Sequence, residues 1–348
     1  MPHTRSRVSG LGVYLPVDTR STAQTELALR ESNPNLMLAT GMIGRLTGVR
    51  SVHLRPEGWQ TSDLAVAAAV DALADSPGPI DLLIFASASQ DLIEPATSHI
   101  VASKLGLDCP VMDVKNACNS VLNAMQVADA LIQTGQYRRV LIASGEQPSH
   151  AVRWQLESKE QFLRSFPGYT MSDGGAAVIL EASDSASDST SDGEGNSDGD
   201  SGILGSTFVA VSSNWNIGTL GTGGSMDPHA ENGSHFDMDG PALQKAFLDL
   251  GPDAVLETLR KLDLEWADFD LVAIHQVALP YLPPIFERLG VASDKSIITI
   301  EDHGNLASVT LPLQLLLARE SGMIGPGSLI ALIGLAGGIS LGVMVIRL

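Results

Sequence analysis

Cys118 is the residue of this chain best placed for nucleophilic chemistry. It lies in the segment 113–120, whose residues predict a short strand that turns directly into an apolar helix ending at Gly135. The unpaired N–H groups and the dipole at a helix N-terminus favour thiolate over thiol, so this position favours a reactive cysteine. It is equally compatible with an inert buried thiol, and the local sequence leaves both interpretations open.

Two residues in the second half of the chain have side chains that could act together with Cys118. His275 ends a predicted strand, and Asn305 follows Gly304 just before a predicted helix at 308–320. Each alone is weak evidence, because a histidine at a strand end is usually structural and a Gly-Asn pair usually forms a turn. Papain-like hydrolases have the same order of cysteine, histidine and asparagine, but their Cys-Gly-Ser-Cys-Trp motif is absent here.

Buried strands alternating with helices predict an α/β fold. Continuous apolar runs, typical of strands covered on both sheet faces, lie at 81–86, 139–145, 174–180, 270–275, 328–334 and 337–346. Further helices are predicted at 62–75, with Ser62 as the N-cap and Asp63 in the first turn, and at 241–262. The motifs follow the same order in both halves, which indicates an internal duplication.

An acidic segment divides the chain. Residues 183–201 contain six Asp or Glu residues and no Lys or Arg, so we expect a surface loop there. The two halves are then 1–182, with the nucleophile, and 202–348, with the histidine and the asparagine. Two like halves packed about a pseudo-twofold axis would bring equivalent loops, and hence the three polar side chains, together near the centre.

Composition excludes several functional classes. The net charge of −19 makes nucleic acid and anionic membrane surfaces poor partners. No apolar stretch reaches the roughly 18 residues of a membrane span, and no signal-peptide core follows Met1. The only two cysteines, Cys109 and Cys118, have no zinc-ligand spacing, so we expect no metal site and a cytoplasmic protein with reduced thiols.

Short motifs occur in order along nearly the whole chain: GLGVYLP at 10–16, LTGVR at 46–50, TSDLA at 61–65, NAC at 116–118, SDGGAA at 172–177, HQ at 275–276, GN at 304–305 and LAGG at 335–338. With these motifs the chain resembles the thiolase-fold condensing enzymes, most closely the β-ketoacyl-acyl carrier protein synthase III group. The resemblance implies a five-layer αβαβα sandwich of two duplicated halves.

The resemblance also implies roles for the polar residues. Cys118 would take an acyl group from a thioester, and the backbone N–H groups of Cys118 and Gly337 would form the oxyanion hole. His275 and Asn305 would hydrogen-bond the carbonyl of a malonyl-type thioester while it loses CO₂. The enolate would attack the acyl-enzyme to give a β-ketoacyl product of fatty-acid or polyketide-type biosynthesis. The family needs no metal or cofactor, is homodimeric, and takes acyl groups from coenzyme A or an acyl carrier protein.

Departures from the family pattern bear on the substrate. Asn119 and Ser120 follow the nucleophile where the family usually has small residues, so Asn119 is a candidate substrate contact. The aromatic and basic residues that clamp adenine align with Met42 and Leu46, which makes coenzyme A a less favoured donor. Candidate substrate-binding residues are therefore Arg153, Arg164 and Phe166, and candidate contacts for an acidic carrier protein are Lys245, Arg260 and Lys261. These changes favour a specialised pathway over the priming of fatty-acid synthesis.

Two other functions fit the same fold. An acyltransferase could pass the acyl group from Cys118 to an alcohol or an amine without forming a carbon–carbon bond. A catalytically silent subunit could bind acyl chains. Asn305 favours condensation, because this asparagine is often replaced in the non-condensing relatives. His303, beside the motif, is expected to be a turn residue facing solvent.

Overall fold

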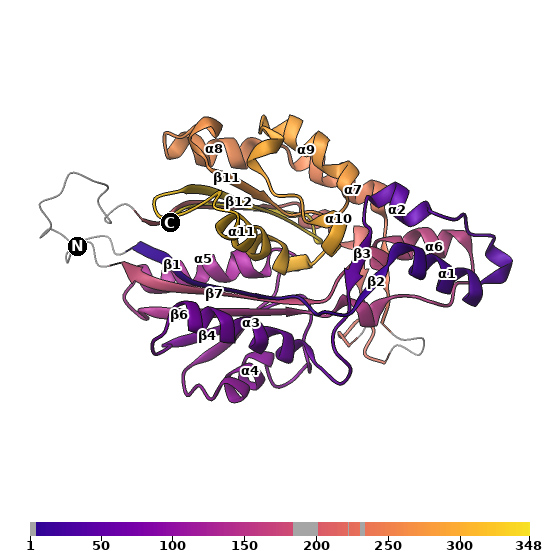
Figure 1. The fold of residues 1–348 in the computed structure, drawn as a ribbon, viewed down its shortest axis with the longest axis horizontal. Helices are drawn as coiled ribbons and strands as arrows, with labels where there is room; N and C mark the ends of the chain where they lie inside the picture. Colours follow the sequence, from indigo (N-terminus) through magenta and orange to yellow (C-terminus); the bar gives the residue numbers. More distant parts are fainter. Residues whose placement is uncertain (1–4, 184–200, 222, 230–233) are drawn as a thin grey trace, which may run out of the picture.

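The computed structural model describes residues 5–183, 201–221, 223–229 and 234–348, and they form the five-layer αβαβα sandwich predicted from the sequence (Figure 1). Two mixed sheets lie face to face with helices between them, and further helices cover both outer faces. None of the helices in these residue ranges is long and apolar enough to cross a membrane. The acidic segment predicted at 183–201 lies outside the described residues except at its two ends.

The first sheet is built entirely from the first half of the chain. Its order is β1 (Arg5–Tyr14), β7 (Gly174–Ser183), β6 (Arg139–Glu146), β4 (Leu82–Ala86) and β5 (Val111–Val114). β1, β7 and β6 pair antiparallel, whereas β6, β4 and β5 pair parallel. α3 (Thr61–Asp75) and α4 (Thr97–Leu105) cover its outer face. A Cβ atom on Gly12 would lie 2.1 Å from the carbonyl oxygen of Ala68, so glycine lets α3 approach the sheet closely.

The second sheet repeats this arrangement in the second half. Its order is β8 (Gly202–Ala210), β13 (Ser340–Arg347), β12 (Leu329–Ala336) and β11 (Leu271–Ile274). β8, β13 and β12 pair antiparallel, and β11 pairs parallel with β12. These strands match β1, β7, β6 and β4 in order and direction, so the predicted duplication is confirmed. β5 has no counterpart among the strands of the second sheet.

The central layer contains the two equivalent helices α5 (Ser120–Gln133) and α11 (Thr310–Glu320). One apolar cluster joins their side chains to the inner faces of both sheets. The outer face of the second sheet packs against α7 (Gly240–Leu250), α8 (Asp253–Lys261) and α9 (Leu282–Leu289). Burial of apolar side chains on both sheet faces therefore explains the continuous apolar strands.

Two predictions about helices were wrong. The helix expected at 241–262 is two helices, α7 and α8, because Gly251 has φ +68° and Pro252 follows it. The N-cap of α3 is Gln60 rather than Ser62. Asp63 lies in the first turn as predicted, and its carboxylate accepts the N–H of Gln60.

Smaller elements gather at one end of the sandwich, on the right of Figure 1. They are α1 (Thr22–Ser32), α2 (Met42–Thr47), α6 (Lys159–Ser165), α10 (Ile300–His303) and the short strands β2 (Thr19–Ser21), β3 (Ser51–His53), β9 (Gly218–Leu220) and β10 (Phe236–Met238). β2 pairs with β3, and β9 pairs with β10. This end holds the polar residues considered next.

Candidate active site

Cys118 lies in a tight turn between β5 and α5. Ala117, just before it, has φ +46°, a conformation that residues with a side chain seldom adopt. The hydroxyl of Ser120 donates to the carbonyl of Ala117 at 2.7 Å and accepts the N–H of Asn116 at 2.9 Å. α5 begins at Ser120, so the thiol lies two residues before the helix, close to the position predicted from the sequence.

The surroundings of the thiol oppose its ionisation. The side chain keeps partial solvent access, yet protein encloses it enough that burial raises the pKa of Cys118 to about 12. The carboxylate of Glu146 raises this pKa further, and the backbone N–H of Cys118 itself acts in the opposite direction. The sequence favoured the thiolate at this position, but in the folded protein burial and the Glu146 carboxylate raise the pKa of the thiol, so the thiol form is favoured near neutral pH.

His275 follows β11 and is 1% exposed. Its backbone N–H donates to the carbonyl of Ile333 at 2.9 Å, which fixes its position at the end of the second sheet. Both ring nitrogens are buried and have no hydrogen-bond partner within the described residues. Burial lowers the pKa of His275 to about 4, so the ring is neutral near pH 7 and carries one N–H group to donate.

Asn305 is held at both its backbone and its side chain. Its N–H donates to the carbonyl of Thr170 at 2.8 Å, and its carbonyl accepts the N–H of Ser172 at 2.9 Å. The side-chain Oδ1 accepts the N–H of Ala307 at 2.9 Å. This bond orients the carboxamide so that its Nδ2 amide group, a donor, can face a substrate.

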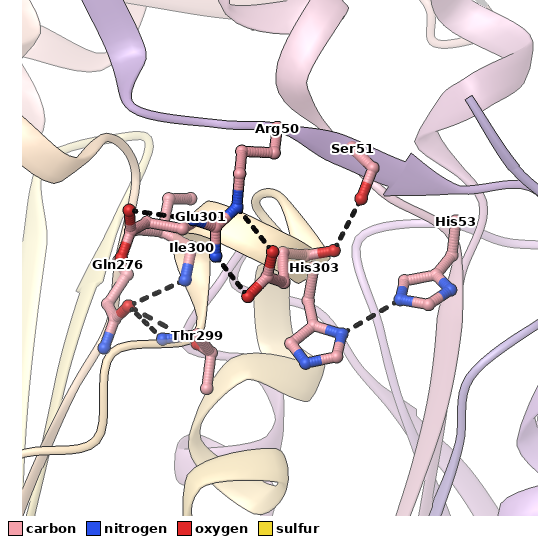
Figure 2. A network of polar contacts seen from close by, with 9 residues as sticks. Arg50, Ser51, His53, Gln276, Thr299, Ile300, Glu301 and His303 are labelled. Carbon is pink, nitrogen blue, oxygen red and sulfur yellow. Dashed lines mark hydrogen bonds and ion pairs between the residues drawn. The ribbon is translucent and has the colours of Figure 1, made fainter. Parts of the chain in front are cut away.

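Gln276, the residue after His275, contacts the start of α10, the short helix that precedes Asn305, and Figure 2 shows these contacts of Gln276. Its Oε1 accepts the N–H groups of Thr299 at 2.9 Å and Ile300 at 3.0 Å, which are the free donors at the start of α10. The residue after His275 thus holds the short helix that leads to Asn305. Sequence analysis included Gln276 in the motif but did not predict this contact.

Cys118 and Asn305 lie close together through the segments that carry them. Cys118 packs against an apolar cluster that contains Met171 and Ala307. Met171 forms an isolated β-bridge with Asn305, and Ala307 is the donor to its side chain. The site therefore combines a thiol with a carboxamide donor. The neutral imidazole of His275 would complete a set that can accept an acyl group and stabilise a developing oxyanion, and its place beside these two groups stays a prediction.

Gly337 lies in the turn between β12 and β13, where Gly338 has φ +81° and Ile339 has φ +55°. A Cβ atom on Gly337 would have no neighbour within 4 Å, so the space beside this backbone is open. In the described part of the chain, the N–H groups of Cys118 and Gly337 form no hydrogen bond with another residue. Their role as an oxyanion hole stays a prediction.

Glu146 is a buried carboxylate beside this site that sequence analysis missed. It ends β6 at 1% exposure, accepts the N–H of Ala88 at 3.0 Å, and accepts the hydroxyl groups of Ser89 and Ser308. Burial raises its pKa, and these donors counteract the effect. It links the nucleophile half to the segment after Asn305. The only sequence signal for it is a single acid at the end of an apolar strand.

The four predicted substrate-binding residues occupy different settings. Asn119 is fully buried, and its Nδ2 donates to Ser340 Oγ at 3.1 Å. Arg164 forms an ion pair with Asp237. The buried Nε of Arg153 has no hydrogen-bond partner in the described structure. Phe166 packs edge-on against Phe162 and Tyr169. Their substrate contacts stay predictions.

The basic residues proposed to contact a carrier protein lie on the exposed surfaces of α7 and α8. Each is paired with a carboxylate of its own helix: Lys245 with Asp249, Arg260 with Glu257 at 2.7 Å, and Lys261 with Glu257 at 3.7 Å. These pairs offset most of the local positive charge. The contact of these residues with a carrier protein stays a prediction.

A cavity of about 670 Å³ lies away from these residues, between β1 and the C-terminus of the chain. Arg7, Arg319 and Arg347 are among its lining residues, and none of the predicted catalytic residues is. Arg319 already pairs with Asp75 at 2.7 Å, and Arg7 lies 3.8 Å from Glu181. We assign no role in the chemistry to this cavity.

Two family models match this chain. The model of the 3-oxoacyl-[acyl-carrier-protein] synthase III C-terminal region matches residues 259–348, and the model of the family's preceding region matches residues 112–199. Together they cover just over half of the chain.

Solved structures of similar fold span whole chains. OleA of Xanthomonas campestris, with cerulenin bound, has a TM-score of 0.86 at 23% identity over 99% of this chain and 97% of that one. FabH of Xanthomonas oryzae pv. oryzae, a 3-oxoacyl-(acyl carrier protein) synthase III, has a TM-score of 0.86 at 23% identity and covers 100% of both chains. FabH of Pseudomonas aeruginosa has a TM-score of 0.81 at 23% identity, over 99% and 98%.

Proposed function

We propose, from the premise that the chain belongs to the 3-oxoacyl-[acyl-carrier-protein] synthase III family of condensing enzymes, that it joins an acyl group to a malonyl-type thioester with loss of CO₂. The product is a β-ketoacyl thioester of a fatty-acid or polyketide-type pathway, and the departures at Met42, Leu46 and Asn119 favour a specialised pathway. No metal or cofactor takes part beyond the phosphopantetheine arm that carries the substrates.

The observation that carries this proposal is that the His275 ring is buried without a hydrogen-bond partner among the described residues. A buried imidazole with no partner on either nitrogen is costly to maintain unless a ligand supplies the partner. Its low pKa keeps it neutral, so it can donate an N–H to a carbonyl without a nearby carboxylate. Asn305, whose carboxamide is oriented by the bond from the N–H of Ala307, supplies a second donor. Two neutral donors fit the carbonyl oxygen of a thioester that becomes an enolate.

The reaction proceeds in two stages. The sulfur of Cys118 attacks the acyl thioester, the carrier thiolate leaves and takes a proton, and the acyl-enzyme forms. The malonyl thioester then loses CO₂, and the electron pair of the broken C–C bond forms an enolate whose oxygen accepts hydrogen bonds from His275 and Asn305. The α-carbon attacks the acyl carbonyl, and the Cys118–acyl bond breaks to release the thiolate.

Intact-mass spectrometry with a panel of acyl-coenzyme A and acyl-carrier thioesters tests the first stage. We expect an adduct of acyl mass on the wild type and none on Cys118→Ala. Release of CO₂ from a malonyl thioester tests the second stage, and His275→Ala or Asn305→Ala should reduce it about 10²–10³-fold. The exposed His99→Ala, on α4, is the control. If no thioester acylates Cys118, the enzymatic function is refuted.

The same assays separate the two alternative functions. Acyl transfer to an alcohol or an amine would discharge the acyl-enzyme without consuming malonyl thioester. A silent acyl-binding subunit would bind the chain without a covalent adduct. The donor that acylates fastest identifies whether coenzyme A or a carrier protein delivers the acyl group, and Lys245→Glu and Arg260→Glu test the predicted carrier contact.

We also propose a homodimer. β5 is the outermost strand of the first sheet, so its free edge can pair with a second copy. Leu92 and Ile93, adjacent in the loop before α4, are 52% and 68% exposed, so they form a pair of neighbouring apolar side chains that a second copy could cover. Ile93→Asp should produce monomers in light scattering, while Val17→Asp, at a 92% exposed residue, should not. The free thiols of Cys109 and Cys118 support a cytoplasmic location.

A further inference from the structure

The side chains of His53 and His303 form a hydrogen bond between the two halves of the chain. Nε2 of His53 lies 3.0 Å from Nδ1 of His303, and the ring planes are 11° apart (Figure 2). His53 ends β3, and His303 ends α10. The expectation that His303 would face solvent is therefore wrong, because its ring is partly buried against the other histidine.

The carbonyl of Pro16 determines the direction of this hydrogen bond. It lies 2.7 Å from Nδ1 of His53 and can only accept, so Nδ1 carries a hydrogen. In the neutral ring the lone pair of His53 is then on Nε2, where it accepts the Nδ1–H of His303. Each neutral histidine thus has one determined tautomer.

The two histidines belong to a closed ring of contacts that contains Asn305. The backbone N–H of His53 donates to the hydroxyl of Ser172 at 2.6 Å, and the N–H of Ser172 donates to the carbonyl of Asn305 at 2.9 Å. Only Gly304 separates Asn305 from His303 in the chain. The bond between the imidazoles closes this ring, so its loss would remove the side-chain link that joins the end of α10, beside Gly304, to β3.

The backbone at Gly304 is tightly packed, so a shift of His303 cannot be taken up at this glycine. Its φ is +64°, and a Cβ atom there would lie 2.6 Å from the carbonyl of Thr170. That carbonyl also accepts the N–H of Asn305. A displacement of His303 is therefore passed on to the segment that holds the carboxamide.

The other contacts of α10 are farther from Asn305 or more exposed. Gln276 holds the start of the helix. Arg50 forms two hydrogen bonds with Asp302, but the side chains are 62% and 60% exposed, so this pair contributes little stability. The hydroxyl of Ser51 donates to the carbonyl of Asp302 at 2.8 Å. The histidine pair is the partly buried link nearest to the carboxamide.

We propose that His53 and His303 are positioning residues that hold Asn305 where it meets the malonyl carbonyl. The pair acts on the condensation stage and leaves the acylation of Cys118 unaffected. This inference rests on the proposed function. It also makes a prediction of its own, because loss of the pair should slow condensation and leave acylation nearly unchanged.

The pair also gives condensation a dependence on pH. One added proton leaves an N–H···N bond between the rings, whereas two protons put two N–H groups face to face and break it. The other histidine and burial both lower the pKa of His303, and Asp302 opposes them. The charged groups packed around the pair are Arg50, Arg55, Asp173, Glu301 and Asp302.

Two variants of His303 test the proposal. His303→Leu removes the donor, whereas His303→Asn places an amide N–H near the position of Nδ1 but cannot titrate. We expect His303→Leu to slow CO₂ release from malonyl thioester about 10–100-fold in single turnovers of the acyl-enzyme, with acylation changed less than about twofold. His303→Asn should recover most of the rate and lose the decline of the wild type at acidic pH. His99→Leu is the surface control.

The readouts distinguish a positioning role from a structural one. Equal losses of rate in acylation and in CO₂ release would overturn the proposal. So would a pH profile of CO₂ release for His303→Asn that still declines at acidic pH as in the wild type. If His303→Leu does not fold, His53→Leu and His53→Gln provide the same comparison, since glutamine keeps an acceptor near Nε2. Absence of acyl-Cys118 in the wild type would instead refute the proposed function, and this inference with it.

Discussion

The Oε1 atom of Gln276 accepts the N–H of Ile300 at 3.0 Å, so the residue beside His275 caps the helix that leads to Asn305. The same oxygen accepts the N–H of Thr299, and the Nε2 group of Gln276 donates to Ile297 at 2.7 Å. One buried amide thereby joins the segment after His275 to the start of the helix before Asn305, and Figure 2 shows its bonds to Thr299 and Ile300.

Replacing Gln276 should damage condensation more than acylation. Gln276→Leu leaves two buried backbone N–H groups unpaired, which costs about 2 kcal/mol or more of unfolding free energy. We expect CO₂ release to fall about tenfold or more, measured alongside urea unfolding. Gln276→Glu keeps the acceptor and should lose less in both measurements. Identical behaviour of the two variants would show that the cap does not position α10.

Alkylation of Cys118 should accelerate steadily with pH. Because burial and Glu146 raise the pKa of this thiol to about 12, its thiolate fraction rises about tenfold per pH unit through the neutral and mildly alkaline range. The rate of reaction with iodoacetamide, followed by mass spectrometry on Cys109→Ser protein, should show no plateau up to about pH 10. A plateau near the ordinary cysteine pKa would contradict the assignment.

Removing the charge of Glu146 should make Cys118 more reactive. The carboxylate opposes a nearby thiolate, so Glu146→Gln lowers the pKa of Cys118 and should speed its alkylation at fixed pH by roughly threefold to tenfold. Glutamine can still accept from Ala88 and Ser308, which preserves the local fold. Glu160→Gln, on the surface of α6, is the control. Slower alkylation would show that the carboxylate assists the thiol.

His275 should make the protein less stable in acid. Its pKa is lower in the folded chain than the ordinary value of 6.5, so the unfolded chain binds the proton more readily. The stabilisation from the neutral ring is present above that value and is lost as the pH falls toward about 4. Over this interval we expect the wild type to lose about 3 kcal/mol more unfolding free energy than His275→Phe. Equal losses would mean that the ring is not buried neutral.

Much of the fold was predictable from the sequence because its signals are local. The apolar run at 139–145 lies within β6, the run at 328–334 overlaps β12 from Leu329 onward, and the helix after Cys118 ends before Gly135 as expected. The break between α7 and α8 was missed because an apolar helical pattern continues across Gly251 and Pro252. The N-cap of α3 was misplaced by two residues, as several polar residues at the start of a helix can serve equally well.

The sequence by itself determined which residues have reactive side chains and on which elements they lie. Residue type and spacing place Cys118 before α5, His275 after β11 and Asn305 ahead of α11. The tertiary structure decided their environments. Burial by distant segments raises the pKa of the thiol and lowers that of His275, and the contacts of Glu146 with Ser308 and of His53 with His303 join residues far apart in the chain. Desolvation and hydrogen-bond partners depend on every segment packed around a group, and no local pattern records them.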